Sequence, residues 1–119
     1  FAEGFHELFG NRAVDVAMPD IGRAGGVLET KNICAVAQAA GVPVSPHNFS
    51  SGVLLAATAH LMAATPNTML LEMDTSGNAI YDDLIIEGIC LKDGEFEIND
   101  KPGLGVDIPE SVLETYAVA

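Results

Sequence analysis

One stretch organises this chain: Val42-Pro43-Val44-Ser45-Pro46-His47-Asn48-Phe49-Ser50-Ser51-Gly52. Its valines and prolines predict an extended segment that ends at a single histidine, and a Ser- and Gly-rich turn then leads into an alanine-rich, helix-like run. A strand that ends on a titratable side chain just before a helix is how α/β enzymes present a catalytic group. His47 is therefore the first candidate for a site residue, although the same pattern also fits a histidine that only hydrogen-bonds locally.

The segments on either side repeat this order of strand and helix. Apolar residues at helical spacing open the chain, and short apolar runs closed by proline or by polar turn residues follow. The predicted elements are a helix over 1–9, a strand over 13–18, a helix over 27–40, a strand over 42–46, a helix over 51–64 and a strand over 68–74. Strands that alternate with helices through short connections are typical of a parallel sheet built from right-handed βαβ units, and hence of an α/β fold.

The pattern changes after residue 78. The pair Asp93-Gly94 lies between two β-prone arms and predicts a β-hairpin over 89–98. Asp107, followed by Pro109 and Glu110, predicts a capped final helix that continues to Tyr116. The acidic run from Tyr81 to Glu87 lacks the spacing of a calcium-binding loop, and we interpret it as a solvated face.

Charge and cysteine content exclude several classes of partner. The 119 residues carry a formal net charge of −12, because 17 acidic side chains oppose 5 basic ones, and 49% of the residues are hydrophobic. This composition predicts one folded domain or part of one, whose field repels nucleic acid and anionic membrane surfaces. Cys34 and Cys90 are far apart and have no CxxC spacing, which favours the reducing cytoplasm over a disulfide scaffold.

Three titratable residues fall at the carboxyl ends of the predicted strands: Asp20, His47 and Glu72. In a parallel sheet these ends share one face, where ligands bind. An aspartate that accepts one imidazole N–H fixes the tautomer and raises the basicity of the other nitrogen, so Asp20 and His47 could form an acid/base pair. Two other interpretations stay open from the pattern alone: Asp20 as a turn residue or helix cap, and Glu72 as a buried, paired carboxylate.

The remaining motifs carry weaker signals. We assign His60, on the alanine-rich helix, to packing or capping, and His6, on the opening helix, to the surface. The glycines between Gly22 and Gly26 match neither a dinucleotide-binding motif nor a P-loop, and they predict a structural turn. The triplet Asn48-Phe49-Ser50 matches the glycosylation pattern, which we interpret as chance.

Four separated motifs nevertheless occur together in this order: Ala17-Met18-Pro19-Asp20-Ile21-Gly22-Arg23-Ala24-Gly25-Gly26, Ser45-Pro46-His47-Asn48, Leu70-Leu71-Glu72 and Pro102-Gly103-Leu104-Gly105-Val106. They resemble the C-terminal third of the mandelate racemase and acid-sugar dehydratase branch of the enolase superfamily, also called the mandelate racemase/muconate lactonizing enzyme family. Asp20 and His47 are 27 positions apart, one βα unit, which suits that branch.

The resemblance implies a modified TIM barrel of the (β/α)7β type. Residues 13–20, 42–47 and 68–73 would be strands six, seven and eight within a barrel fragment over 1–78. Residues 79–119 would be a C-terminal tail, with the hairpin and the final helix, that joins a capping domain. A complete barrel takes about 250 residues, so we expect a fragment, in which Phe1 lies inside a helix.

The resemblance also implies a chemistry. It is that of a Mg²⁺-dependent enzyme that abstracts the proton α to the carboxylate of a small substrate, a sugar acid. His47 would be the general acid/base, Asp20 would orient it, and Glu72 would donate a hydrogen bond, in its protonated form, to the substrate carboxylate. The family's metal ligands are expected upstream of Phe1, so this chain should hold none of them and should be inactive alone.

Three functions follow as hypotheses. The first is an acid-sugar dehydratase, a hydro-lyase that is cytoplasmic and homo-oligomeric at full length. The second is a racemase or epimerase of the same superfamily. A third, of another class, is a non-catalytic binding or assembly protein that retains the barrel scaffold.

Overall fold

The computed structural model describes residues 1–79, 81 and 89–118. Its helices and strands, in chain order, are α1 (Ala2–Gly10), α2 (Val27–Ala39), α3 (Gly52–Ala63), β1 (Ile89–Lys92), β2 (Glu95–Ile98) and α5 (Glu110–Tyr116). The three helices predicted before residue 70 are confirmed to within one residue at each end. The described residues form an α/β structure in which helices accompany extended segments and a small sheet.

Local signals explain where the helices begin and end. Gly26, before α2, has a φ of 93°, and Gly41, just beyond the C-cap of α2, has a φ of 72°, a conformation that glycine adopts without steric cost. Ser51 caps α3, because its hydroxyl accepts a hydrogen bond from the Leu54 amide at 3.2 Å. Eight of the twelve residues of α3 are buried, which accounts for its lack of a polar face.

The three predicted strands pair in parallel, but over a shorter length than predicted. Val44 lies between Ala17 and Thr68, and each contact is an isolated parallel bridge rather than a regular strand. Hydrogen bonds from Ala17 N to Pro43 O, from Ser45 N to Ala17 O and from His47 N to Pro19 O join the first two segments.

Two prolines account for the interruption of this pairing. Pro19 and Pro46 have no N–H, so neither can supply the next bond of its ladder. Beyond Val44, the Ser45 hydroxyl instead donates to Leu70 O at 2.7 Å. The predicted strands are therefore extended segments joined by isolated bridges and a few hydrogen bonds rather than by a continuous ladder.

The tail contains the predicted hairpin. β1 and β2 pair antiparallel with Lys92 opposite Glu95, and Asp93 and Gly94 both have positive φ, as a two-residue hairpin turn requires. The predicted cap of the last helix is wrong. Pro109 is the N-cap of α5, without a side-chain cap, and the Asp107 carboxylate lies 3.5 Å from Lys101 Nζ instead.

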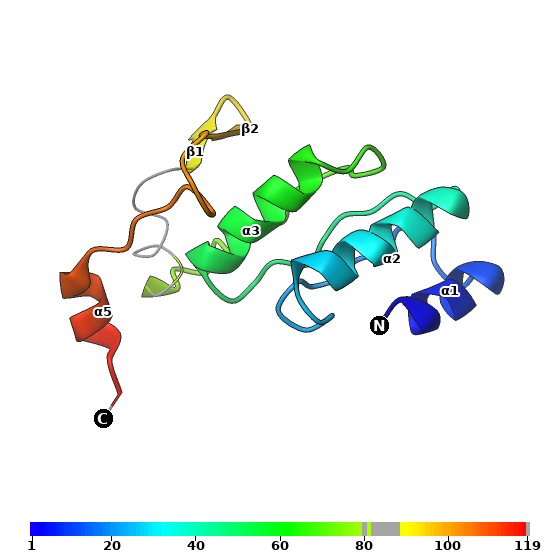
Figure 1. Cartoon of the computed structure of the whole chain (residues 1–119), viewed down its shortest axis with the longest axis horizontal. Helices are drawn as coiled ribbons and strands as arrows, with labels where there is room; N and C mark the ends of the chain where they lie inside the picture. The colour runs from blue at the N-terminus through cyan, green and yellow to red at the C-terminus, as the bar shows by residue number, and fades with distance from the viewer. Residues whose placement is uncertain (80, 82–88, 119) are drawn as a thin grey trace.

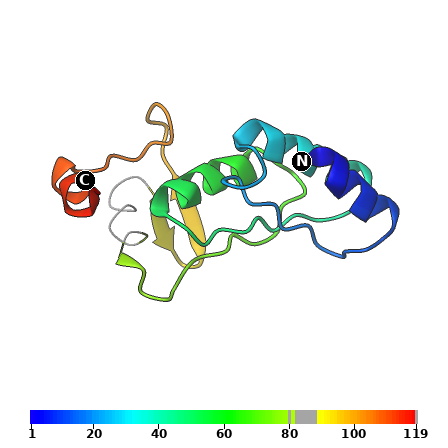
Figure 2. The ribbon, with the colours of Figure 1, turned by 90° about the horizontal axis from the view of Figure 1, so that it is seen from below.

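The helices lie along one side of the extended segments. Figure 2 shows α2 and α3 on the same side of these segments, while α5 stands apart from the other helices in Figure 1. The buried core between them is apolar and includes Phe9, Ala17, Ile21, Cys34, Ala37, Val44, Leu54, Ala57 and Leu61.

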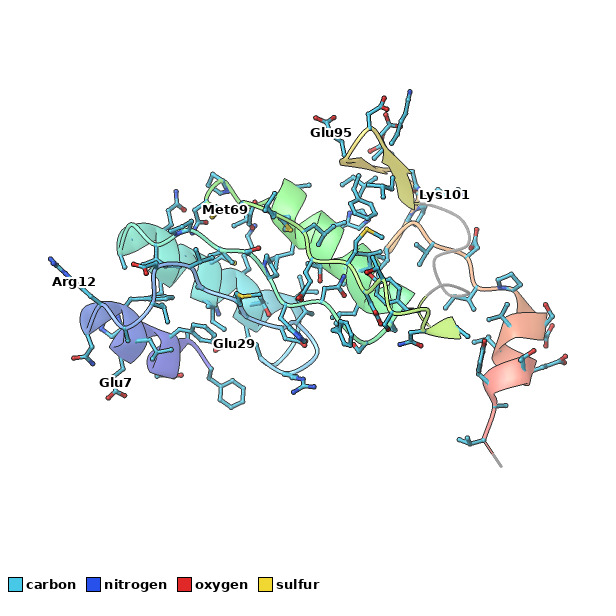
Figure 3. The ribbon with its side chains drawn as sticks, turned by 180° about the vertical axis from the view of Figure 1, so that it is seen from behind. Glu7, Arg12, Glu29, Met69, Glu95 and Lys101 are labelled. Carbon is cyan, nitrogen blue, oxygen red and sulfur yellow. The ribbon has the colours of Figure 1, made fainter. Side chains whose placement is uncertain are left out.

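Two contacts hold neighbouring parts of this arrangement together. Glu29, labelled in Figure 3, joins the first two helices. Its carboxylate accepts a hydrogen bond from the Ala2 amide at 2.8 Å. Leu104 packs against the core from the tail. No helix in the described part of the chain has the length and apolar character needed to cross a bilayer.

Candidate active site

The structure brings His47 and Asp20 into direct contact. The hydrogen bond from His47 N to Pro19 O, 3.1 Å long, places the ends of the first two extended segments side by side. At that edge His47 Nδ1 lies 2.8 Å from Asp20 Oδ2. The Asp20 side chain is only 9% exposed, whereas that of His47 is 37% exposed, so the pair has a buried carboxylate and an accessible imidazole.

Further contacts fix the Asp20 carboxylate. Its Oδ1 accepts from the Gly22 amide at 2.7 Å, and Arg23 Nε lies 3.6 Å from Oδ2 on a side chain that is 84% exposed. An ionised carboxylate can only accept hydrogen bonds, so the His47 nitrogen that faces it is the one that carries the proton. In a neutral imidazole, Nε2 is then left as the basic atom.

Glu72 lies beside the residue that follows His47. Its Oε2 accepts from the Asn48 amide at 2.7 Å, and its backbone carbonyl accepts from Asn48 Nδ2 at 3.0 Å. The same Nδ2 lies 3.3 Å from the Tyr81 hydroxyl. All three site candidates are thus linked through two adjacent positions, His47 and Asn48, at one edge of the parallel segments.

Two residues of this network were not found from the sequence. Asn48 is fully buried, and its side-chain nitrogen is occupied, which agrees with the interpretation of the glycosylation triplet as chance. Tyr81 was assigned to a solvated acidic face, and this was wrong, because its side chain is 1% exposed. The other positions of that face, Asp82 to Glu87, lie outside the described residues.

The other candidates lie away from this network. His60 Nε2 bonds to Leu104 O at 3.0 Å, so the prediction of a structural role is confirmed, and His6 is exposed. The residues from Gly22 to Gly25 form a turn. Burial raises the pKa of the Cys34 thiol, which keeps it protonated and makes it a poor nucleophile. The side chain of Cys90 is not among those described.

The donors among the described residues do not form a magnesium site. Mg²⁺ prefers several oxygen ligands in octahedral geometry. Among the residues that the structure describes, no three histidine, cysteine or acidic side chains gather closely enough to hold a metal ion. The Asp20 carboxylate is already engaged with His47, Gly22 and Arg23. No described residue is therefore assigned to a metal.

Comparison with known proteins identifies the family. Residues 2–112 match the model of the enolase C-terminal domain-like family. The chain belongs to this family. Asp20, His47 and Glu72 all lie within the part of the chain that matches the enolase C-terminal domain-like model.

The relatives agree with this assignment. The chain is 35% identical over 122 residues to the D-xylonate dehydratase of Haloferax volcanii, covering 98% of this chain and 30% of that protein. It is 34% identical to the arabinonate dehydratase of Saccharolobus solfataricus, covering 94% of this chain and 30% of that one. It thus spans about 30% of the length of these relatives.

A solved structure has the same fold. The 3,6-anhydro-D-galactonate cycloisomerase from Zobellia galactanivorans superposes with a TM-score of 0.87 at 38% identity. The superposition covers 97% of this chain and 32% of that chain.

Proposed function

We propose that this chain forms part of an acid-sugar dehydratase, which removes water from a sugar acid after abstraction of the proton next to its carboxylate. The observation that carries the proposal is the His47–Asp20 pair, with Nδ1 and Oδ2 2.8 Å apart and the imidazole accessible. Relatives named as dehydratases of D-xylonate and arabinonate support the reaction and the substrate class.

In this proposal His47 is the residue that moves the proton. Its Nε2 accepts the proton α to the substrate carboxylate, and Asp20 stabilises the imidazolium that forms and keeps the ring oriented. His47 then returns the proton to the departing β-hydroxyl, which leaves as water. Glu72 has Oε2 engaged with the Asn48 amide. Protonated on Oε1, it would donate a hydrogen bond to the substrate carboxylate, and this bond strengthens as negative charge develops.

The proposal extends to the protein beyond this chain. Residues 1–78 would contribute strands six to eight of a (β/α)7β barrel, and 79–119 the tail that joins a capping domain. The full-length protein would use Mg²⁺, would be cytoplasmic and would form homo-oligomers. The ligands of the cation would come from segments outside this chain.

Isomerisation is a second candidate reaction, supported by two relatives. The cycloisomerase from Zobellia galactanivorans and the D-galactarolactone cycloisomerase of Agrobacterium fabrum, 31% identical to this chain, are both named for isomerisation rather than loss of water. In deuterium oxide, deuterium that enters unreacted substrate without loss of water would favour an isomerase or racemase. Release of a 2-keto product would favour the dehydratase.

The direct test is the substitution His47→Asn in the full-length protein. We expect turnover of a sugar acid to fall by at least about 100-fold, because general acid/base catalysis contributes on the order of 10²–10⁴. The matched control is His6→Asn, which changes the same residue type at an exposed position of α1 and should leave turnover unchanged. Unchanged turnover in His47→Asn would refute the role of His47 as the acid/base, whereas binding of a sugar acid without turnover in the unsubstituted full-length protein would support a non-catalytic binding protein on the same scaffold.

A further inference from the structure

Asn48 has the contacts of a residue that holds another in place. Its side chain is completely buried, and its Nδ2 donates to Glu72 O at 3.0 Å and to the Tyr81 hydroxyl at 3.3 Å. Its own backbone amide donates to Glu72 Oε2 at 2.7 Å. Asn48 therefore binds Glu72 at two points. Its side-chain amide donates to the backbone carbonyl of Glu72, and its backbone amide donates to the Glu72 carboxylate.

These two hydrogen bonds depend on each other. The side-chain amide of Asn48 fixes the distance between the segment at residue 48 and the segment at residue 72. This spacing between the two segments determines whether the backbone amide of Asn48 lies close enough to Glu72 Oε2 to form a hydrogen bond. Asn48 Oδ1 is buried and has no partner among the described residues, so the asparagine is held by its donor side alone. A buried polar atom without a partner is costly, and such groups cluster where function requires them.

We propose that Asn48 is a positioning residue for the Glu72 carboxylate, and that it couples the strand end bearing His47 to the one bearing Glu72. This inference rests on the proposed function, in which Glu72 contacts the substrate carboxylate. Asn48 touches no reacting atom and acts by setting the direction of the Glu72 side chain. Misplacement of a catalytic group by about 1 Å can cost on the order of 100-fold in rate.

The chain offers a closely matched control in Asn67. Its Nδ2 also bridges two acceptors, Cys34 O at 3.1 Å and Val42 O at 3.2 Å, and its Oδ1 is also buried without a partner in the described part. Asn67 precedes Thr68, at the beginning of the third extended segment, whereas Glu72 lies near its end. It therefore resembles Asn48 in its hydrogen bonds but not in its nearness to the site.

The test compares Asn48→Ala, Asn67→Ala, Glu72→Ala and the double variant Asn48→Ala/Glu72→Ala in the full-length protein, by steady-state kinetics and thermal unfolding. We expect Asn48→Ala and Asn67→Ala to lower the melting temperature by a similar few degrees. Only Asn48→Ala should lower kcat, by roughly tenfold. This loss should disappear in the Glu72→Ala background, which has no side chain left to position, because residues that act through one another are non-additive.

Each result has a distinct meaning. Equal losses of kcat in Asn48→Ala and Asn67→Ala, or additive losses with Glu72→Ala, would overturn the positioning role while leaving the function intact. Unchanged turnover in Glu72→Ala would instead refute the proposed role of Glu72. If Asn48→Ala fails to fold, Tyr81→Phe removes only the hydroxyl that contacts Asn48 Nδ2. It should then give a smaller loss of kcat, about threefold, that also vanishes beside Glu72→Ala.

Discussion

At the scale of single residues, Gly22 helps to hold Asp20, one member of the proposed catalytic pair, in place. A Cβ added to Gly22 would lie 3.2 Å from Asp20 Oδ1, so an alanine would push against the carboxylate that the Gly22 amide now binds at 2.7 Å. We expect Gly22→Ala to lower kcat of the full-length protein by roughly tenfold, because Asp20 must orient His47 within a fraction of an ångström. Steady-state kinetics at saturating substrate measures this effect.

The control for this prediction is Gly4→Ala. A Cβ at Gly4 meets no atom within 4 Å, and Gly4 lies inside α1. This change should leave kcat untouched and raise stability by about 0.5–1 kcal/mol, because alanine is the better helix former. A loss of kcat in Gly4→Ala equal to that in Gly22→Ala would show that the effect is not local to Asp20.

The pairing of His47 with Asp20 could be predicted from the sequence, whereas the surroundings of Glu72 could not. Both members of the pair end extended segments that are adjacent in a βαβ order, so topology alone brings them together. Asn48 adjoins His47 in the sequence, but nothing local marks its buried contacts with Glu72. Tyr81 reaches Asn48 across 33 positions, and its acidic neighbours indicated exposure instead.

At the scale of elements, α3 and the turn that follows it each contain a buried threonine, and only one of the two hydroxyls has a hydrogen-bond partner among the described residues. Thr58 is completely buried, and its Oγ1 has no partner among the described residues, whereas Thr65, just beyond the helix, donates to Leu61 O at 2.6 Å. We expect Thr58→Val to leave the free energy of unfolding unchanged or raise it by up to about 1 kcal/mol. Thr65→Val should lower it by about 1 kcal/mol, since a formed hydrogen bond is lost.

Urea denaturation of the two valine variants measures both effects on the same scale. The substitutions have the same chemistry and nearly the same volume, so each serves as the control for the other. A clear loss of stability in Thr58→Val would mean that its hydroxyl is satisfied by a group beyond the described residues.

Elements with local signals were predicted well, and those that depend on distant partners were not. The ends of α2 and the turn of the hairpin follow from glycines whose positive φ the sequence itself suggests. The parallel strands were predicted too long because the ladder stops where Pro19 and Pro46 lack an N–H. These prolines were visible in the sequence, but which neighbour each would face was not. Likewise, Asp107 fails as a cap because α5 starts at Glu110, two residues beyond the position that Asp107 could cap.

At the scale of the whole molecule, the tail is connected to the parallel segments through a chain of polar contacts. Asp74 accepts from the Ser76 amide at 2.8 Å and lies 3.4 Å from Asn78 Nδ2. Asn78 Oδ1 in turn accepts from the Tyr81 amide at 3.4 Å, and the Tyr81 hydroxyl meets Asn48. On the other side, the bond from His60 to Leu104 O joins α3 to the turn before α5. Residues of the tail, Tyr81 and Leu104, which follow the βα units, therefore contact Asn48 and His60 within those units.

The ionisation of Asp74 makes the stability of this connection between the parallel segments and the tail depend on pH. Its hydrogen bonds with Ser76, and a weaker one with Asn78, lower the pKa of the carboxyl below its ordinary value of 3.8. Because the folded state favours the charged form, its contribution to stability is complete above about pH 3.8, the value that applies in the unfolded chain. The contribution is lost as the pH falls through the lower pKa of the folded state. The chain has seventeen acidic residues, so a comparison of variants is needed to isolate the contribution of Asp74.

We therefore expect Asp74→Asn to lower the melting temperature at pH 7 and to make it fall less steeply between pH 4 and pH 2 than in the unsubstituted protein. An asparagine can still accept one hydrogen bond from Ser76 N, but it has no charge to lose. Asp100→Asn, at an exposed position in the turn after β2, should reproduce the unsubstituted pH profile. Thermal unfolding at half-unit pH steps supplies the curves. Parallel curves for Asp74→Asn and Asp100→Asn would mean that the ionisation of Asp74 does not stabilise the junction between the parallel segments and the tail.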